Sequence, residues 1–433
     1  MKAPVPAVFV LLAPFLAASQ TIEIKPAVMV GFDPSPGKTY AIETTSNFSE
    51  WSAATPALVG QSERVGRFFV SDAAQRFFRV AQSDVIDLAA DLTPIRSTHN
   101  LPALGCAVVM SNRIVGLGVV GVRKHGVTEA ATVHDHWHHG SMTKSMTAAL
   151  AALLVDEGLI TWTAKLVDLF PEHAATRHAG WGTVTLEMLL TNSGGAPGDL
   201  GPSGIWTQLW NHPGTPHEQR LFLTQEVTKL APRFTPGTGY EYSNAGFAMA
   251  GAMLEKVTGR TWEQLLSERL FAPLGMATGG FGVPATPRHI DHPWGHTFSG
   301  ATPSPIAPGT SADNPPGIGP AGTVNCSLID FARYAAFQLA GARGENTLLQ
   351  PASHQKLFTP ANASYAMGWI VADRSWGGGT VYNHTGSNTQ WFTNVWIAPN
   401  RNWAVVVVTN IGGNAAFTAT DAVVGAMIAK FIP

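Results

Sequence analysis

Residues 20–83 alternate apolar and polar positions in short runs, a pattern typical of β-strands rather than helices. The runs with this period are Thr21–Ile24, Thr39–Glu43, Arg67–Val70 and Phe77–Val80, and Gly31–Lys38 has the composition of a turn. We therefore expect residues 20–83 to form a small all-β module. Such a module contacts a surface or a polymer, or it serves as a spacer, and the sequence leaves both roles open.

From residue 84 onward, helical patterns lie between two groups of strand-like runs. Strands are expected at Leu104–Met110, Ile114–Val122, Thr393–Ile397 and Trp403–Thr409, and helices at Ser141–Asp156, Leu186–Leu190, Ala245–Val257, Trp262–Leu270 and Thr418–Phe431. The Gly- and Pro-rich stretches Asp199–Pro216 and Arg288–Pro316 are expected to be irregular loops. Residues 84–433 are thus predicted to form an α/β (α+β) domain, with an antiparallel sheet flanked by helices and a helical lobe beside it.

Residues 1–19 have the pattern of a signal peptide. Lys2 precedes an apolar run, Val5–Ala17, and Ala17-Ala18-Ser19 supplies small residues for cleavage before Gln20. The run is too short to span a bilayer comfortably, and Pro14 interrupts it. We therefore expect an exported protein, periplasmic or secreted, whose mature chain has no integral membrane span.

Composition narrows the function classes. The chain has 27 Lys and Arg against 29 Asp and Glu, a net charge of −2, which excludes nucleic-acid binding through bulk positive charge. An apolar fraction of 45% excludes a disordered chain. Only two cysteines are present, Cys106 and Cys326, and the sequence leaves open whether they pair in an oxidising compartment.

Ser141-Met142-Thr143-Lys144 is the first motif with candidate chemistry. A serine at the start of a helix lies in the positive end of the helix dipole, and a lysine three residues later lies on the same face. Serine needs a neighbouring base, and lysine acts as one when burial lowers its pKa. By itself the motif is weak, because a serine in that place is also an ordinary N-cap.

Two further motifs follow in the chain. In Tyr242-Ser243-Asn244, the phenol can relay a proton, and the Asn244 amide can orient Lys144 and donate to a substrate carbonyl. In His384-Thr385-Gly386-Ser387, Gly386 lets a substrate lie along a strand edge. The backbone N–H of Ser387 could join that of Ser141 in an oxyanion hole.

With these motifs in this order, residues 84–433 resemble the class C β-lactamase-related serine hydrolases, which share the penicillin-recognising fold. Further matching segments are Gly140–Ser145 (GSMTKS), Leu189–Gly195 (LLTNSGG), Pro236–Asn244, Pro273–Met276 (PLGM), Gly319–Gly322 and Gly368-Trp369. The resemblance implies a β-lactamase/transpeptidase-like fold and a hydrolase that needs no metal or nucleotide cofactor.

The resemblance also implies roles for individual residues. Ser141 would be the acylated nucleophile, and Lys144 and Tyr242 would share base and acid duties. Asn244 would hold Lys144 and the substrate. The remaining binding positions would be His384, Thr385, Gly386 and Ser387.

His384 is where the chain departs from class C β-lactamases, which usually carry lysine there to attract the substrate carboxylate. A histidine is largely neutral near pH 7 unless a neighbour raises its pKa. We therefore rank an esterase or a D-amino-acid amide or peptide hydrolase first, as in D-alanyl-D-alanine carboxypeptidases, D-aminopeptidases and family VIII-type esterases. The alternatives are a true β-lactamase and a non-catalytic relative that binds penicillin or peptidoglycan.

Three tempting signals are expected to be structural. Gly317–Gly322 matches G-x-G-x-x-G, but it lacks the strand and helix of a dinucleotide site. The histidines of the run His134–His139 could ligate zinc, but packing near the pocket is favoured. Tryptophans such as Trp206, Trp210, Trp369, Trp376 and Trp391 fit either a substrate cleft or the core.

Overall fold

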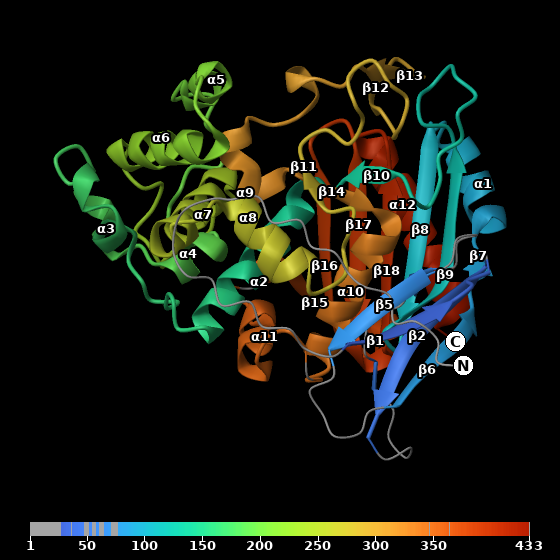
Figure 1. Ribbon diagram of the computed structural model, residues 1–433. Coiled ribbons are helices and arrows are strands. Elements are labelled where there is room, and N and C mark those ends of the chain that lie inside the picture. The colour runs from blue at the N-terminus through green and yellow to red at the C-terminus, as the bar shows by residue number, and fades with distance from the viewer. Residues whose placement is uncertain are drawn as a thin grey trace, which may run out of the picture.

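The computed structural model describes residues 27–35, 37–46, 52–53, 58–59, 65–70, 77–345, 347–362 and 364–432. The predicted leader, residues 1–19, and the predicted strand Thr21–Ile24 lie outside these residues. In Figure 1 a large sheet occupies one side of the body, and most helices gather on the other side.

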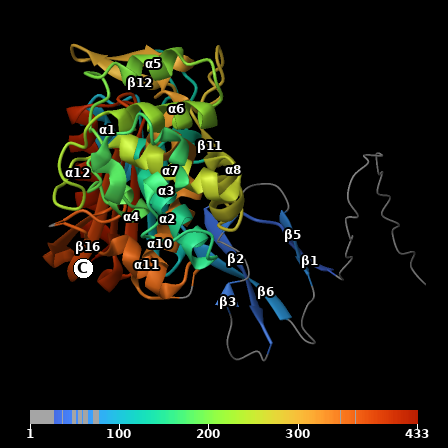
Figure 2. The same cartoon turned by 90° about the vertical axis from the view of Figure 1, so that its left-hand side faces the viewer.

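The N-terminal part consists of strands. β1 (Ala27–Phe32) pairs with β5 (Val65–Val70), and β2 (Lys38–Thr45) pairs with β3 (Ser52–Ala53), β4 (Leu58–Val59) and β6 (Phe77–Asp84), all antiparallel. Figure 2 shows these strands beside the body. The three predicted strands within the described residues are confirmed, but the turn expected from residue 31 begins later, because Gly31 and Phe32 belong to β1.

A seven-stranded sheet forms the centre of the body. Its order is β15 (Ile370–Arg374), β16 (Gly379–Ser387), β17 (Phe392–Ala398), β18 (Trp403–Thr409), β8 (Ala103–Met110), β9 (Arg113–Gly121) and β7 (Ile86–Asp87). β18 pairs antiparallel with β8, with Val406 opposite Ala107, so strands from the two ends of the body do share one sheet. β7 pairs parallel with β9, which makes the sheet mixed rather than wholly antiparallel.

The central strand β18 is buried on both faces of the sheet. Along β18, Val405 and Val407 face α1 (Ala89–Thr98) and α12 (Asn414–Phe431), whereas Val406 and Val408 face α10 (Leu328–Ala342). A strand buried on both faces has no need of polar positions, which explains the unbroken apolar run WAVVVV.

The helical lobe packs beside the sheet, with α2 (Thr143–Asp156) between the two (Figure 1). Residues 143–154 of α2 are all buried. The other helices are α3 (Leu166–Leu169), α4 (Leu186–Leu190), α5 (Ile205–Asn211), α6 (Pro216–Lys229), α7 (Asn244–Thr258), α8 (Trp262–Leu266), α9 (Gly319–Gly322) and α11 (Pro351–Phe358). Short strands complete the body: β10 (His136–His138), β14 (Val324–Ser327) and β11 (Gly280–Phe281) form one sheet, and β12 (Gly295–Ser299) and β13 (Thr302–Ile306) form a hairpin.

The predicted helices are confirmed, but the sequence patterns missed α1, α6, α10 and α11. The expectation of irregular structure in two stretches was wrong in part, because the first contains α5 and the second contains the β12–β13 hairpin. α6 was not recognised because its buried positions include the polar residues Gln219, Arg220 and Thr224, so the sequence lacks the helical spacing of apolar residues. Its start is nevertheless marked by a capping box between Thr215 and Glu218.

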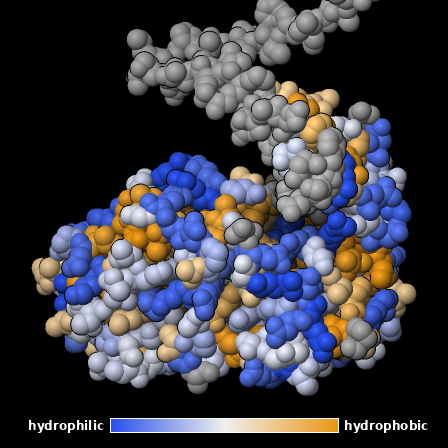
Figure 3. All heavy atoms as spheres, turned by 90° about the horizontal axis from the view of Figure 1, so that it is seen from below, coloured by the Kyte–Doolittle hydropathy of each residue, from blue (hydrophilic) through white to orange (hydrophobic). Residues whose placement is uncertain are grey.

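Cys106 and Cys326 are both buried free thiols, which decides against the disulfide that the sequence left open. Within the described residues, no helix combines the length and the apolar character needed to cross a membrane. Seen from below, hydrophobic residues form separate patches among hydrophilic ones (Figure 3).

Candidate active site

Ser141 lies in a 3₁₀ turn, Gly140–Met142, directly before α2. The helix was expected to begin at Ser141, but its regular part begins two residues later. Gly140 has φ +49°, and a Cβ there would lie 2.4 Å from the backbone N of Ser387 on β16. Only glycine permits this approach. It places the backbone at Ser387 directly beside the turn that carries Ser141.

Lys144, one turn along the same helix, is wholly buried against Ser141. Its Nζ lies 3.0 Å from Ser141 Oγ, 2.7 Å from Asn244 Oδ1 and 2.8 Å from the carbonyl oxygen of Ala321. All three partners are uncharged, so burial lowers the pKa of Lys144 well below its usual range. A neutral amine donates to Asn244 and Ala321 and keeps its lone pair for the Ser141 hydroxyl proton.

Tyr242 completes this group. Lys144 Nζ lies 4.7 Å from the centroid of its ring, and its hydroxyl hydrogen-bonds with Ser141. Burial raises the pKa of the Tyr242 phenol, and the bond with Ser141 only partly opposes this. The lowered pKa of Lys144 and the raised pKa of Tyr242 favour a neutral amine and a protonated phenol over a resting phenolate.

Ser243, the middle residue of the second motif, sets the position of its two neighbours. Its hydroxyl caps α7 by accepting from Gly246 N at 3.0 Å, and its backbone N–H donates to Asn192 Oδ1 at 3.0 Å. Asn244 is thereby held at the first turn of α7. No role was predicted for Ser243, although a serine followed by a helical pattern is an N-cap signal.

The third motif lies at the end of β16, directly before β17, which agrees with the expectation that Gly386 lies on a strand. A Cβ at Gly386 would lie 1.9 Å from the carbonyl oxygen of His139, so the strand closes directly onto the Ser141 turn. Thr385 lies between His384 and Gly386 on this strand, opposite Asn394 of β17. The extent of the strand was not predicted, because Gly377–Gly379 and polar residues obscure its pattern.

His384 is buried beside Tyr242, with ring centroids 6.1 Å apart. Its Nδ1 donates to the carbonyl oxygen of Thr385 at 2.6 Å, which leaves Nε2 as an acceptor 3.5 Å from the Tyr365 hydroxyl. Burial is the largest cause that lowers the pKa of His384 to about 4. The side chain is therefore neutral at pH 7. Tyr365 carries no motif signal and was not predicted.

Ala321 O, the third acceptor of Lys144, lies in the segment that matches G-x-G-x-x-G. The carbonyl of Pro320 accepts from Thr147 Oγ1 at 2.7 Å, which fixes the segment on α2. A backbone carbonyl leaves no trace in sequence, so this acceptor was not predicted from the residues. The segment therefore accepts a hydrogen bond from Lys144 through the carbonyl of Ala321.

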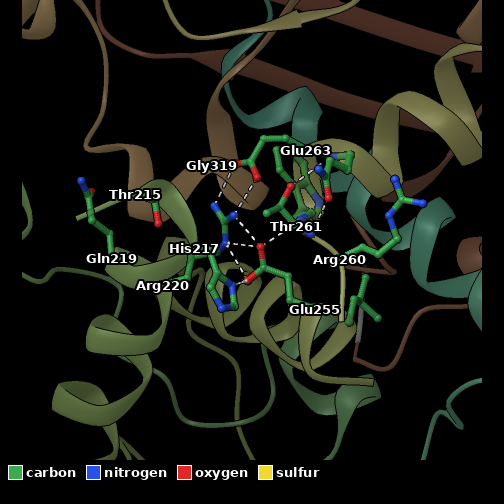
Figure 4. Close-up of polar contacts among 12 residues, drawn as sticks. Thr215, His217, Gln219, Arg220, Glu255, Arg260, Thr261, Glu263 and Gly319 are labelled. Atoms are coloured by element: carbon green, nitrogen blue, oxygen red, sulfur yellow. Dashed lines mark hydrogen bonds and ion pairs between the residues drawn. The ribbon is translucent and has the colours of Figure 1, made fainter. Parts of the chain in front are cut away.

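Figure 4 shows a cluster of charged side chains around Arg220. The cluster contacts the chain at Pro316, a few residues before Ala321. Arg220 is wholly buried, and its guanidinium donates to Glu255 and Glu263 at 2.6 to 3.2 Å and to the carbonyl oxygen of Pro316 at 3.4 Å. Glu255 also faces His217 at 2.8 Å. Burial alone would lower the pKa of Arg220, but the two carboxylates raise it above its ordinary value. The cluster ties α6, α7 and α8 to the segment that carries Ala321.

Within the described ranges, no three His, Cys, Asp or Glu side chains are placed to hold a metal ion. His136 stacks on His292 with ring centroids 4.1 Å apart, and His138 and His139 are buried. The structure thus brings Ser141, Lys144, Tyr242 and Asn244 into contact, with the His384–Ser387 strand against them.

A family model described as Beta-lactamase matches residues 87–429, most of the chain. The chain belongs to the β-lactamase family. Its mixed sheet, flanking helices and helical lobe are those of the β-lactamase/transpeptidase-like fold.

Relatives within the β-lactamase family have different activities. The chain is 25% identical over 338 residues to Penicillin-binding protein 4 of Amycolatopsis lactamdurans, covering 76% of this chain and 85% of the relative. It is 29% identical over 196 residues to lovastatin esterase of Penicillium rubens (41% and 48%) and 28% identical over 205 residues to D-aminopeptidase of Brucella ovis (46% and 38%). The chain therefore spans less than half the length of the last two.

Among solved structures, the octameric penicillin-binding protein homologue from Pyrococcus abyssi superposes with a TM-score of 0.64 at 20% identity. The superposition covers 79% of this chain and 78% of the other. This likeness establishes the fold.

Proposed function

We propose that the protein is a serine hydrolase that cleaves an ester or a D-amino-acid amide or peptide bond through an acyl-enzyme on Ser141. The observation that carries this proposal is the environment of Lys144. Two neutral acceptors take its N–H groups, and Ser141 Oγ lies 3.0 Å from Nζ. An amine held in this way is a base for one specific hydroxyl.

In the acylation step, each proton that moves has a donor and an acceptor among these residues and the substrate. Lys144 takes the proton of Ser141 as Oγ attacks the substrate carbonyl, and the backbone N–H groups of Ser141 and Ser387 receive the oxyanion. Tyr242 gives its phenolic proton to the leaving group and regains one from the Lys144 ammonium group. Water later attacks the acyl carbon, the bond to Ser141 Oγ breaks, and the same pair passes the proton of the water to Ser141 Oγ, which regenerates the hydroxyl and releases the acid.

The neutral state of His384 favours esters and amides over β-lactam antibiotics. A β-lactam carries a carboxylate, and a neutral imidazole attracts it less than a lysine ammonium group would. A true β-lactamase is therefore the second candidate. The non-catalytic alternative is disfavoured by the contact between Lys144 and Ser141, which a binding protein has no need to maintain. Export remains a prediction from the sequence.

A substrate panel tests the proposal. Purified protein is assayed with p-nitrophenyl esters of several chain lengths, D-alanine p-nitroanilide, a D-Ala-D-Ala peptide and a chromogenic cephalosporin, and intact mass spectrometry follows acylation. We expect turnover of an ester or D-aminoacyl substrate and an adduct that Ser141→Ala abolishes. Unchanged turnover by Ser141→Ala would overturn the mechanism, and labelling by a fluorescent penicillin without any turnover would indicate a binding protein.

A further inference from the structure

The turn that carries Ser141 is held by a buried histidine that the proposed mechanism does not use. His138, the last residue of β10, is wholly buried, and its Nδ1 accepts a hydrogen bond from the backbone N–H of Gly140 at 3.1 Å. Gly140 is the first residue of the turn and directly precedes Ser141. The bond therefore restrains the peptide unit next to the one that carries the Ser141 N–H.

This hydrogen bond also decides the tautomer of His138. A protonated ring would turn an N–H toward the N–H of Gly140, so the ring is neutral and its one hydrogen lies on Nε2. Nε2 lies 2.8 Å from Asp313 Oδ1, although its N–H is not aligned for a hydrogen bond, so the contact is an electrostatic one. The ring also stacks on Trp391, with ring centroids 5.6 Å apart. His138 is thus held between a carboxylate, an aromatic ring and the Ser141 turn.

Asp313 is linked to the other side of the proposed oxyanion hole as well. Its Oδ1 accepts from Asn388 Nδ2 at 3.3 Å, and Asn388 directly follows Ser387. One carboxylate oxygen is therefore connected, through one side chain in each direction, to the backbone beside both proposed donors. His138 leads to Gly140, and Asn388 leads to Ser387.

A third contact joins the same loop to the carbonyl segment that accepts from the proposed base. Asn314 donates its backbone N–H to Asp313 Oδ1 at 2.7 Å and its Nδ2 to the carbonyl oxygen of Gly322 at 3.2 Å. Gly322 directly follows Ala321, and a Cβ at Gly322 would lie 3.8 Å from the carbonyl carbon of Gly140. Three segments that surround the nucleophile therefore meet at two neighbouring loop residues.

The environment of Asp313 differs from that of a carboxylate that stabilises the fold. Its side chain is 8% exposed, and no lysine or arginine pairs with it in the part of the chain that the structure describes. Its Oδ2 is buried without a hydrogen-bond partner among those residues. A buried carboxylate without a cation costs free energy, whereas Glu255 is paired with Arg220. An uncompensated group of this kind calls for a functional explanation, and the contacts of Oδ1 supply one.

We propose that Asp313 and His138 are positioning residues, which hold the two backbone N–H groups of the proposed oxyanion hole in register with each other. Neither side chain touches the reacting atoms. His138 acts through the peptide of Gly140, and Asp313 acts through His138 and Asn388. Donors that are fixed in advance need no reorganisation when charge develops on the substrate oxygen. This inference rests on the proposed function and assigns roles to two residues outside the three motifs.

The first test compares Asp313→Ala with Asp313→Asn in the hydrolysis of p-nitrophenyl butyrate. Alanine removes Oδ1, and we expect kcat to fall about 10- to 100-fold with KM nearly unchanged, because a misplacement of about 1 Å costs up to about 100-fold in rate. Asparagine keeps an oxygen acceptor of the same reach and should recover most of the lost kcat. Thermal unfolding gives the folded fraction, so that kcat is expressed per folded molecule.

Asp330→Ala is the matched control. Asp330 is also buried, and its carboxylate also accepts from a backbone N–H, that of Thr278 at 2.7 Å. It lies on α10, and its other contacts are with the Thr278 hydroxyl and Arg333. We expect this variant to lose stability and to keep its kcat per folded molecule.

A second pair of variants tests the contact at Gly140. In His138→Asn the amide oxygen takes the place of Nδ1 as an acceptor, whereas His138→Leu has no acceptor. We expect kcat to fall about tenfold or more in the leucine variant and to be retained better in the asparagine variant. Phenylboronic acid forms a tetrahedral adduct with a reactive serine, and its oxygen would occupy the oxyanion hole. Its affinity should fall by the same factor as kcat/KM in each variant, which a purely structural role would not produce.

Three results would overturn the inference. Asp313→Ala and His138→Leu could lower kcat no more than Asp330→Ala, the asparagine variants could be no better than their apolar counterparts, or boronate affinity could stay constant while kcat/KM falls. If Asp313→Ala does not fold, the two His138 variants decide. In all these cases the proposed function stands if Ser141→Ala abolishes turnover and acylation, and it fails separately if Ser141→Ala retains them.

Discussion

Lys144 and Arg220 are both wholly buried basic side chains, yet they are partnered in opposite ways. Lys144 has a hydroxyl, an amide oxygen and a backbone carbonyl. Arg220 has two carboxylates, Glu255 and Glu263. Burial therefore lowers the pKa of Lys144, whereas in the Arg220 cluster the carboxylates outweigh burial and raise the pKa.

The difference in partners suits Lys144 to proton transfer and Arg220 to holding helices together. A cation without a counter-charge gives up its proton readily, which suits a base. A cation with two carboxylates keeps its charge and fixes the elements that bear them. The two meet at one backbone segment, since Arg220 donates to Pro316 O and Lys144 donates to Ala321 O.

The largest effect, a loss of catalytic rate, is expected from a substitution at Lys144. Lys144→Met removes the base and keeps a similar shape, so we expect kcat to fall by about 10²- to 10⁴-fold. Folding should survive, because the substitution removes a desolvated amine that has no ionic partner. The check is an ester assay beside thermal unfolding. A variant that loses activity only because it unfolds would contradict the assignment of Lys144 as a base.

Arg220→Met should show the opposite profile. It leaves Glu255 buried without a cation, and breaking a buried pair in this way costs about 3–5 kcal/mol of unfolding free energy. Chemical denaturation measures the loss. The variant that also carries Glu255→Gln and Glu263→Gln should recover much of the stability, because no uncompensated charge remains. Full stability of Arg220→Met alone would refute the anchoring role.

Acidification should separate the two cations in a third way. In the proposed mechanism neutral Lys144 is the active form, so kcat/KM should fall about tenfold per pH unit below its lowered pKa. Stability depends on different groups. The pKa of Glu255 is held below its ordinary 4.5, since the bonds from Arg220 overcome burial, so its stabilisation is present above pH 4.5 and is lost as pH falls through the lowered pKa.

For Lys144 the linkage has the same sign but covers a different pH window. The unfolded chain binds the extra proton between the lowered pKa and the ordinary 10.5, so this residue makes stability rise with pH in that window. A pH profile of activity and one of unfolding free energy, on the wild type and on Glu255→Gln, test both statements. An unfolding profile that Glu255→Gln leaves unchanged below pH 4.5 would count against the first.

The same contrast explains what could be predicted from sequence. Side chains in motifs, such as Ser141, Lys144 and Tyr242, were identified together because their order along the chain resembles a family. The sheet was predictable because Trp403–Thr409 is long and apolar. Ala321 O is a backbone atom, which no residue type signals. The partners of Arg220 lie 35 and 43 residues away in the sequence, so the pattern of α6 resembles that of a helix face exposed to solvent. The position of Tyr365 beside His384 depends on tertiary packing alone.

The smallest effect is expected from adding a second cation beside Lys144. His384→Lys restores the lysine of class C β-lactamases next to Tyr242, where the wild-type imidazole is neutral. A charged hydrogen bond to a substrate carboxylate should raise kcat/KM for a chromogenic cephalosporin roughly tenfold. Neutral esters gain no such bond, and repulsion from the new charge lowers the pKa of Lys144 further, so their acidic limb should move to lower pH. His384→Gln, uncharged and of similar reach, is the control. Equal gains for the ester and the cephalosporin would mean that His384 acts through packing rather than through its missing charge.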